Sequence, residues 1–273
     1  MVPMMTGVTR NQGHGAKLAI FDLDKTIINT SASMAYGRPL AERGLIGTPE
    51  VLRMMVHLGN YMLTTHTEEN MQATKHALLG MVRDREEEAL RSVAQDALQE
   101  VITPYIYAEA RTLLEEHREQ GHRIAIVTAS PSVMVEPIAN ELGVDHLIAT
   151  ELEVKDGLFT GEVLHFNKGI SKVEHIRGLV EAEGYDLENS FAYSDSFTDL
   201  PMLQLVGNPT AVNPDRPLRK YALEHNWPIL RFENPEPLFQ QSAVLAGAGA
   251  TLALLGAVAT GLAFWFKSRD EDT

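Results

Sequence analysis

The chain has 273 residues, 44% of them hydrophobic, which is enough for one large domain or for a core domain with an insertion. A formal net charge of -14 argues against a general nucleic-acid binder, because phosphate backbones select basic surfaces. The lack of cysteine excludes disulfides, thiolate nucleophiles and cysteine-ligated metals. Residues 1–16 have no apolar core, so we expect a disordered leader and no signal peptide.

The first predicted strand covers residues 17–21, a short apolar run that is followed at once by a charged turn. This turn carries Asp22 and Asp24, whose side chains would point to the same side if the strand stayed extended. An isolated Asp-x-Asp is more often an acidic turn or a helix cap than a catalytic pair. The rest of the chain must decide between these two interpretations.

The segment from residue 31 to residue 120 is predicted to be an inserted helical subdomain. Apolar positions recur there at three- and four-residue spacing, most clearly in 51–63 and 84–101. Pro104 suits the first turn of a further helix that ends near Gly121. No strand as clear as the first one appears in this segment.

After the insertion, the pattern alternates between strands and helices. Residues 123–127 form a second apolar strand, stopped at residue 128, and a helix follows to about Leu142. A strand, a turn and a helix in succession predict a parallel α/β sheet. The other predicted elements are a strand at 146–150, a hairpin at 151–163 with an Asp156-Gly157 turn, a helix at 169–183, strands at 191–194, 210–212 and 229–232, and a helix that carries Leu200, Met202, Leu203 and Leu205.

Residues 241–266 are predicted to form a transmembrane helix. From residue 243 to residue 266 the chain has no charged side chain, and this run reaches the length that crosses a bilayer. Lys267 and Arg269 follow in a polar tail, residues 267–273. An Ala/Gly-rich buried or disordered tail is the alternative. The missing signal peptide favours a single-pass anchor in the cell membrane with a cytoplasmic catalytic domain, whereas the flanking positive charges are nearly balanced.

Polar residues follow three of the predicted strands, at the position where open α/β sheets bind ligands. Thr128 ends the second strand, and its hydroxyl and the next backbone amides could hold phosphate oxygens. Asp195 and Asp199 follow the strand at 191–194, where they could bind a cation that prefers oxygen ligands. Each residue taken alone could be an ordinary helix cap, but their shared position favours one site.

The chain carries four motifs whose sequence and order resemble those of the haloacid dehalogenase (HAD) superfamily of phosphohydrolases. The first is Asp22-Leu23-Asp24-Lys25-Thr26, the second is Thr128, the third is a lysine early in a helix, and the fourth runs from Ser194 through Asp195 and Asp199 to Pro201. The resemblance covers residues 17–232. It implies a Rossmann-like parallel sheet core, residues 17–30 and 121–240, and makes the insertion at 31–120 a helical cap.

The resemblance also implies the role of each residue. Asp22 would be the nucleophile and Asp24 the general acid and base. Thr128 and Lys172 would bind the phosphoryl oxygens. Mg²⁺ would be held by Asp22, the backbone carbonyl of Asp24, Asp195 and, directly or through water, Asp199.

Two lysines compete for the third motif, because Lys168 and Lys172 both lie near the start of one helix. Lys172 precedes Asp195 by an interval similar to that in phosphoserine phosphatases, and apolar residues at helical spacing follow it. We therefore expect Lys172 to bind phosphate and Lys168 to be a solvated loop residue.

The leading hypothesis is a membrane-anchored, Mg²⁺-dependent phosphomonoester hydrolase of the subfamily IB, phosphoserine-phosphatase-like branch. Its substrate would be a small-molecule or lipid phosphate. Phosphoserine is disfavoured, because phosphoserine phosphatases carry a glutamate shortly after the first motif and residues 27–35 contain no acid. The alternatives are a phosphoserine phosphatase and a membrane-tethered regulatory module with incidental activity. Arg38, Arg43 and Arg53 in the cap are expected to be solvated charges.

Overall fold

The computed structural model describes residues 15–45 and 82–235. The predicted leader up to residue 14, the predicted helix at 51–63, Arg53 and the predicted transmembrane helix at 241–266 lie outside these ranges. Within the described ranges, no helix is both long enough and apolar enough to cross a membrane.

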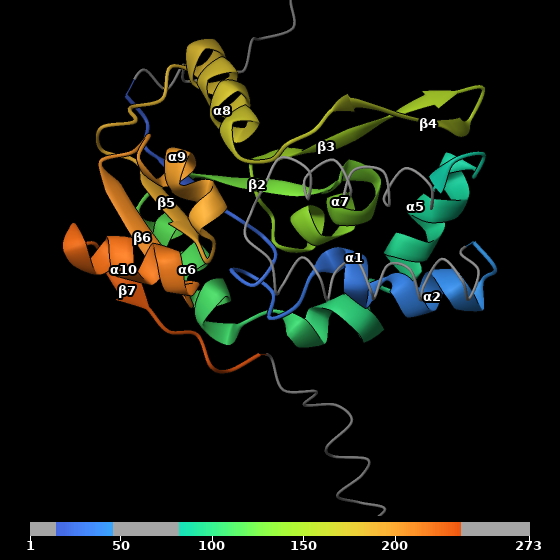
Figure 1. Ribbon diagram of the computed structural model, residues 1–273, viewed down its shortest axis with the longest axis horizontal. Helices are drawn as coiled ribbons and strands as arrows, with labels where there is room; N and C mark the ends of the chain where they lie inside the picture. Colours follow the sequence, from blue (N-terminus) through green and yellow to red (C-terminus); the bar gives the residue numbers. More distant parts are fainter. Residues whose placement is uncertain (1–14, 46–81, 236–273) are drawn as a thin grey trace, which may run out of the picture. The chain divides into compact units, whose positions relative to one another are not determined.

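The core of the protein is a sheet in the strand order β4-β3-β2-β1-β5-β6-β7 (Figure 1). All neighbouring strands run parallel except β3 and β4, which form an antiparallel hairpin. The strand order reverses at β1, because β2 lies on one side of it and β5 on the other. The strands are β1 (Leu18–Phe21), β2 (Arg123–Pro131), β3 (His146–Lys155), β4 (Leu158–His165), β5 (Phe191–Ser194), β6 (Asn208–Val212) and β7 (Ile229–Leu230).

Strand β1 is buried on both faces, which explains its uninterrupted apolar sequence. Leu18 and Ile20 face one apolar cluster, and Ala19 and Phe21 face a second one, as the alternation of side chains along a strand requires. The first cluster contains residues of α8, α9 and α10, and the second contains residues of α6, α7 and the inserted segment. The sheet is therefore covered on both sides by apolar clusters, and its strand ends remain as the place for charged groups.

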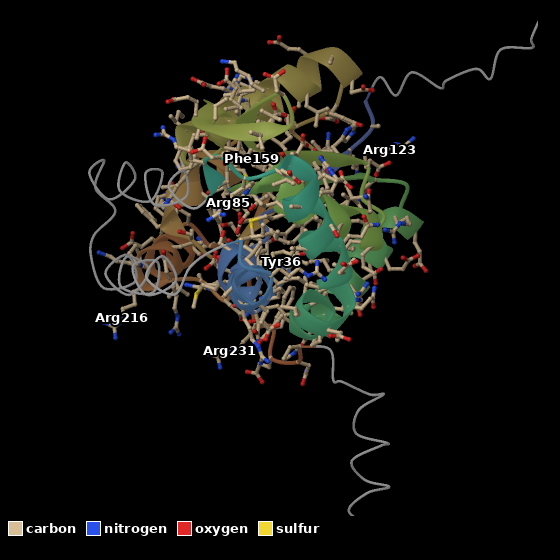
Figure 2. The ribbon with its side chains drawn as sticks, turned by 90° about the vertical axis from the view of Figure 1, so that its right-hand side faces the viewer. Tyr36, Arg85, Arg123, Phe159, Arg216 and Arg231 are labelled. Carbon is tan, nitrogen blue, oxygen red and sulfur yellow. The ribbon has the colours of Figure 1, made fainter. Side chains whose placement is uncertain are left out.

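In the described ranges, several helices lie between β1 and β2, as the predicted insertion requires, and single helices connect most of the later strands. The helices are α1 (Ala32–Ala35), α2 (Gly37–Glu42), α5 (Glu87–Asp96), α6 (Ala108–Glu119), α7 (Ser132–Glu141), α8 (Ile170–Glu183), α9 (Leu200–Leu203) and α10 (Arg216–Glu224), with short helical turns η1 (Leu98–Ile102), η2 (Thr103–Tyr105) and η3 (Phe197–Asp199). In Figure 2, Tyr36 lies in the interior beside α2, whereas Arg216 and Arg231 project outward.

Several predicted strand boundaries are wrong. Strand β6 begins at Asn208 and not at residue 210, and β7 ends at Leu230 and not at residue 232. Strand β2 does not stop at residue 128 but continues to Pro131, with a break in its pairing to β3 between Val127 and Pro131. The two predicted pieces at 146–150 and 151–155 form a single strand, β3. The predicted Asp156-Gly157 turn is present, and both of its residues have a positive φ, which suits a tight hairpin turn.

The β3–β4 hairpin extends beyond the sheet and contacts the inserted segment at the start of α5 (Figure 1). The N–H of Asp84 donates to the carbonyl of Phe159 at 2.9 Å, and the N–H of Phe159 donates to the carbonyl of Arg85 at 2.9 Å. The N–H of Glu87 donates to the carbonyl of Gly157 at 3.0 Å. These backbone hydrogen bonds attach the predicted cap to the core hairpin. They lie far in sequence from residues 31 and 120, where the predicted cap joins the core.

The last helix of the predicted cap, α6, packs against β2 of the core. It begins at Ala108, after a separate turn that contains Pro104, so Pro104 does not start it. His117 of α6 is buried, and its Nε2 lies 2.8 Å from the hydroxyl of Tyr193 on β5. Burial lowers the pKa of His117 to about 4, so the ring is neutral at neutral pH.

Candidate active site

Asp22 lies directly after β1, in the middle of the sheet. Its N–H donates to the carbonyl of Tyr193 on β5 at 2.9 Å, which fixes the backbone between two neighbouring strands. The chain then turns sharply, because the N–H groups of Thr26, Ile27 and Ile28 all point to the carbonyl of Leu23. The side chain of Asp22 is buried, which makes its charge costly without a partner.

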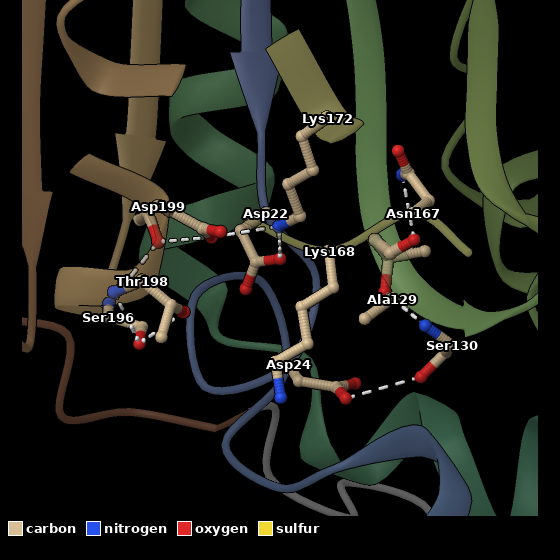
Figure 3. A network of polar contacts seen from close by, with 12 residues as sticks. Asp22, Asp24, Ala129, Ser130, Asn167, Lys168, Lys172, Ser196, Thr198 and Asp199 are labelled. Carbon is tan, nitrogen blue, oxygen red and sulfur yellow. Dashed lines mark hydrogen bonds and ion pairs between the residues drawn. The ribbon is translucent and has the colours of Figure 1, made fainter. Parts of the chain in front are cut away.

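Lys172 supplies that partner. Its Nζ lies 2.7 Å from Oδ1 of Asp22 and 2.8 Å from Oδ2 of Asp199, and both the lysine and the carboxylates are buried (Figure 3). Burial lowers the pKa of Lys172, but the attraction of Asp199 and Asp22 outweighs it and raises the pKa above its ordinary value. Ser194 adds a hydroxyl that donates to Oδ2 of Asp199 at 2.8 Å.

Burial also acts on Asp22, whose pKa it raises to about 7 in spite of Lys172. Oδ2 of Asp22 accepts no hydrogen bond from the residues in the described ranges, whereas Oδ1 faces Lys172. One oxygen is thus held in place, and the other is available to attack an electrophile.

Asp24 is fixed by three donors in the turn and beyond it. The N–H of Ala32 donates to Oδ1 at 2.9 Å, and the hydroxyls of Ser31 and Ser130 lie 3.2 Å from Oδ2. Burial raises the pKa of Asp24, although these hydrogen bonds oppose the shift. A carboxyl group with a raised pKa can hold a proton for a general acid step.

Asp195 follows β5 and belongs to the same charge cluster. Burial, Asp22 and Asp199 raise the pKa of its carboxyl well above the usual range. Carboxylate oxygens are the ligands that Mg²⁺ prefers, and a divalent cation would relieve this crowding, so the donor set fits Mg²⁺. In residues 15–45 and 82–235, no three carboxylate or imidazole groups form a preformed metal-binding cluster. Asp22 and Asp199 are instead paired with Lys172.

Thr128 lies in the irregular part of β2, between the two stretches that pair with β3. Its Oγ1 accepts a hydrogen bond from the N–H of Ser130 at 3.1 Å, and its carbonyl accepts one from Nδ2 of Asn167 at 2.9 Å. Asn167 also donates to the carbonyl of Ile148 at 2.9 Å and is completely buried. The break in strand pairing, which the sequence did not predict, positions Thr128 and Ser130 at the edge of the site.

Lys168 is not the solvated loop residue that we expected. It is half-buried, and burial lowers its pKa to about 8. The charges of Asp199, Lys172 and Asp22 also act on this pKa, which places the ammonium group near the catalytic cluster. Both lysines therefore interact electrostatically with Asp22 and Asp199, and Lys172 also contacts these carboxylates directly.

Several residues of the site were missed by the sequence reasoning. For Ser31 and Ser130, which donate to Asp24, the only sequence signal was that each is a serine close to one of the first two motifs. Asn167 had none, because its role depends on two distant backbone carbonyls. Two cap arginines agree with expectation: Arg38 pairs with Glu42 at 2.7 Å and Arg43 with Asp96 at 2.9 Å, and all four side chains are exposed.

A family model described as haloacid dehalogenase-like hydrolase matches residues 19–204. The chain belongs to this family. The matched region includes all the site residues described above. The predicted α/β core and the predicted hydrolase class are therefore confirmed.

The most informative relatives of this HAD hydrolase come from Mycobacterium tuberculosis. A probable phosphatase is 40% identical over 239 residues, which cover 87% of this chain and 83% of the relative. A phosphoserine phosphatase is 33% identical over 246 residues, which cover 87% of this chain and 79% of that protein. A solved structure from Bordetella pertussis, of a protein with unknown function, has a TM-score of 0.70 at 31% identity and covers 79% of this chain and 98% of its own.

The ion-pair arrangement predicts a large effect of Lys172 on stability. Lys172→Met leaves Asp22 and Asp199 buried without a counter-charge, so we expect the free energy of unfolding to fall by about 3 kcal/mol. Urea denaturation of the purified chain, without added metal, measures this difference. Lys155→Met is the matched control, because Lys155 is an exposed lysine paired with Glu153. Equal stability of the two variants would contradict the account of the pair.

Proposed function

We propose that this HAD hydrolase is a Mg²⁺-dependent phosphomonoester hydrolase that works through an aspartyl-phosphate at Asp22. One observation carries the proposal: Lys172 holds Oδ1 of the buried Asp22 at 2.7 Å while Oδ2 is available for attack. A phosphate dianion repels a carboxylate, so a nucleophile of this kind needs positive charge around it. The site supplies that charge through Lys172.

The reaction then has two steps. Oδ2 of Asp22 attacks phosphorus in line, the bond to the leaving oxygen breaks, and Asp24 gives its proton to that oxygen. Asp24, now a carboxylate, takes a proton from a water molecule that attacks phosphorus. This second attack breaks the bond to Asp22 and releases inorganic phosphate. The hydrogen bonds from Ser31, Ala32 and Ser130 hold the carboxyl group of Asp24 in place for this role.

Thr128 and Lys172 are assigned to the oxygens of the phosphoryl group. Asp22, the backbone carbonyl of Asp24 and Asp195, with Asp199 in support, would hold Mg²⁺, which would neutralise charge on the phosphoryl group. The raised pKa values of Asp22 and Asp195 support this assignment: burial is their main cause and the neighbouring carboxylates add to it, so a bound cation would stabilise the charged forms.

The proposed substrate is a small-molecule or lipid phosphate. Phosphoserine is a second candidate, because one relative is named phosphoserine phosphatase. Against it, residues 27–35 contain no acid that could bind the amine of phosphoserine. We further propose that residues 241–266 anchor the protein in the cell membrane, with the catalytic domain on the cytoplasmic side. The uncharged run within 241–266 supports the anchor.

The proposed nucleophile is tested by Asp22→Asn. This variant removes the attacking oxygen with little change in shape, so we expect kcat for 4-nitrophenyl phosphate to fall at least about a thousandfold in the presence of Mg²⁺. The full-length protein is assayed in detergent by release of nitrophenol. Asp156→Asn, in the exposed hairpin turn, serves as the control and should retain full activity. If Asp22→Asn kept its rate, Asp22 could not be the nucleophile.

The proposed anchor is tested by membrane fractionation. The full-length chain should stay in the membrane pellet after an alkaline carbonate wash, because a spanning helix is removed only by detergent. A chain that ends at Gln240 should appear in the supernatant. Release of the full-length chain by carbonate alone would show that residues 241–266 do not span the bilayer.

A further inference from the structure

The pairing of β2 with β3 is interrupted beside the residues assigned to the phosphoryl group. Residue 127 pairs with residue 148 and residue 131 with residue 150, so residues 128–130 of β2 lie opposite a single residue of β3. An interruption of this kind takes backbone groups out of the regular ladder. The side chains that bind these backbone groups therefore influence where Thr128 lies.

Asn167 spans the interruption with its side chain. Its Nδ2 donates to the carbonyl of Thr128 on β2 and to the carbonyl of Ile148 on β3, both at 2.9 Å. Figure 3 shows Asn167 against the irregular part of β2. One amide group thus uses both of its protons to hold the two strands together across the break. Asn167 is completely buried, so these hydrogen bonds are shielded from bulk water.

Thr150 supplies a second polar bridge at the same place. Its hydroxyl donates to the carbonyl of Ala129 at 2.7 Å and accepts from the N–H of Asn167 at 3.2 Å. Thr150 is also completely buried. Asn167 and Thr150 together hold residues 128 and 129 of β2 by their backbone carbonyls.

The amide oxygen of Asn167 reaches the helix that carries Lys172. This Oδ1 lies 2.9 Å from Nδ1 of His175 on α8, and because an amide oxygen can only accept, His175 donates here. Lys172 lies about one turn earlier on the same helix, and its Nζ holds Asp22. Asn167 therefore connects the strand of Thr128 with the helix of Lys172, the two residues assigned to the phosphoryl oxygens.

We propose that Asn167, together with Thr150, is a positioning residue that sets the separation of Thr128 and Lys172 and thereby the affinity of the site for a phosphoryl group. Asn167 and Thr150 act through the backbone of β2 and through α8, without touching the phosphoryl group. This inference rests on the proposed function, because it takes the roles of Thr128 and Lys172 from it.

The test uses Asn167→Leu, which keeps the size of the side chain without the amide, and Thr150→Val, which lacks only the hydroxyl. For the full-length protein in detergent with Mg²⁺, calorimetric titration should show the dissociation constant of inorganic phosphate rising about tenfold in Asn167→Leu and about fivefold in Thr150→Val. Thr150→Ser keeps the hydroxyl and should stay within about twofold of the wild-type constant. Thr112→Val is the matched control, because Thr112 is exposed and its hydroxyl donates to the carbonyl of Ala108 within α6.

A purely structural role of the two residues would give a different result. Partial unfolding lowers the fraction of molecules that bind phosphate, which reduces the stoichiometry of the titration and kcat but leaves the dissociation constant unchanged. An unchanged constant in Asn167→Leu or in Thr150→Val, or an equal loss in Thr150→Ser, would overturn the inference. If Asn167→Leu does not fold, the comparison of Thr150→Val with Thr150→Ser decides alone.

Failure of the inference is distinguishable from failure of the proposed function. If the wild-type protein neither binds phosphate nor hydrolyses 4-nitrophenyl phosphate, or if Asp22→Asn keeps its rate, the proposed function fails and the inference fails with it. If hydrolysis depends on Asp22 and the variants bind phosphate like the wild type, the proposed function stands and the role of Asn167 and Thr150 is wrong.

Discussion

The buried ion pair that Lys172 forms with Asp22 and Asp199 is the interaction on which the rest of the site depends. Removing three charged groups from water costs several kcal/mol for each, and only close pairing offsets this cost. The pairing is close, with Nζ within 2.8 Å of both carboxylates. It joins three elements that are distant in sequence: the end of β1, the start of α8 and the segment after β5. The same contact leaves one oxygen of Asp22 available for chemistry.

The sheet explains why these groups meet. Because β1, β2 and β5 are parallel neighbours, their carboxyl ends lie at one edge, where the strand order reverses. Both faces of β1 are buried, so the strand itself is shielded from water. The charges at its end are therefore desolvated, which raises the pKa values of Asp22, Asp24 and Asp195 and prepares one carboxyl group to carry a proton.

Much of this arrangement could be predicted from the sequence. The strands at 17–21 and 191–194 were recognisable because buried parallel strands are short, continuous apolar runs, and the residues that follow them carry the motifs. Other features depend on contacts that no local pattern encodes. The break in β2 that positions Thr128, the bonds of Asn167 to two backbone carbonyls and the approach of Lys168 to the site all arise from the packing of distant segments. Lys168, expected to be a solvated loop residue, is half-buried and interacts with the charges of Asp199, Lys172 and Asp22.

The central claim is that Asp22 becomes phosphorylated during turnover. It is tested by acid quenching of the full-length protein during hydrolysis of radiolabelled 4-nitrophenyl phosphate, followed by mass spectrometry of the peptide that contains Asp22. Acid preserves an acyl phosphate, so the account predicts a labelled phosphoryl group on Asp22 in the wild-type protein and none in Asp22→Asn. Phosphate release without any label on the protein, or a label on another residue, would contradict it.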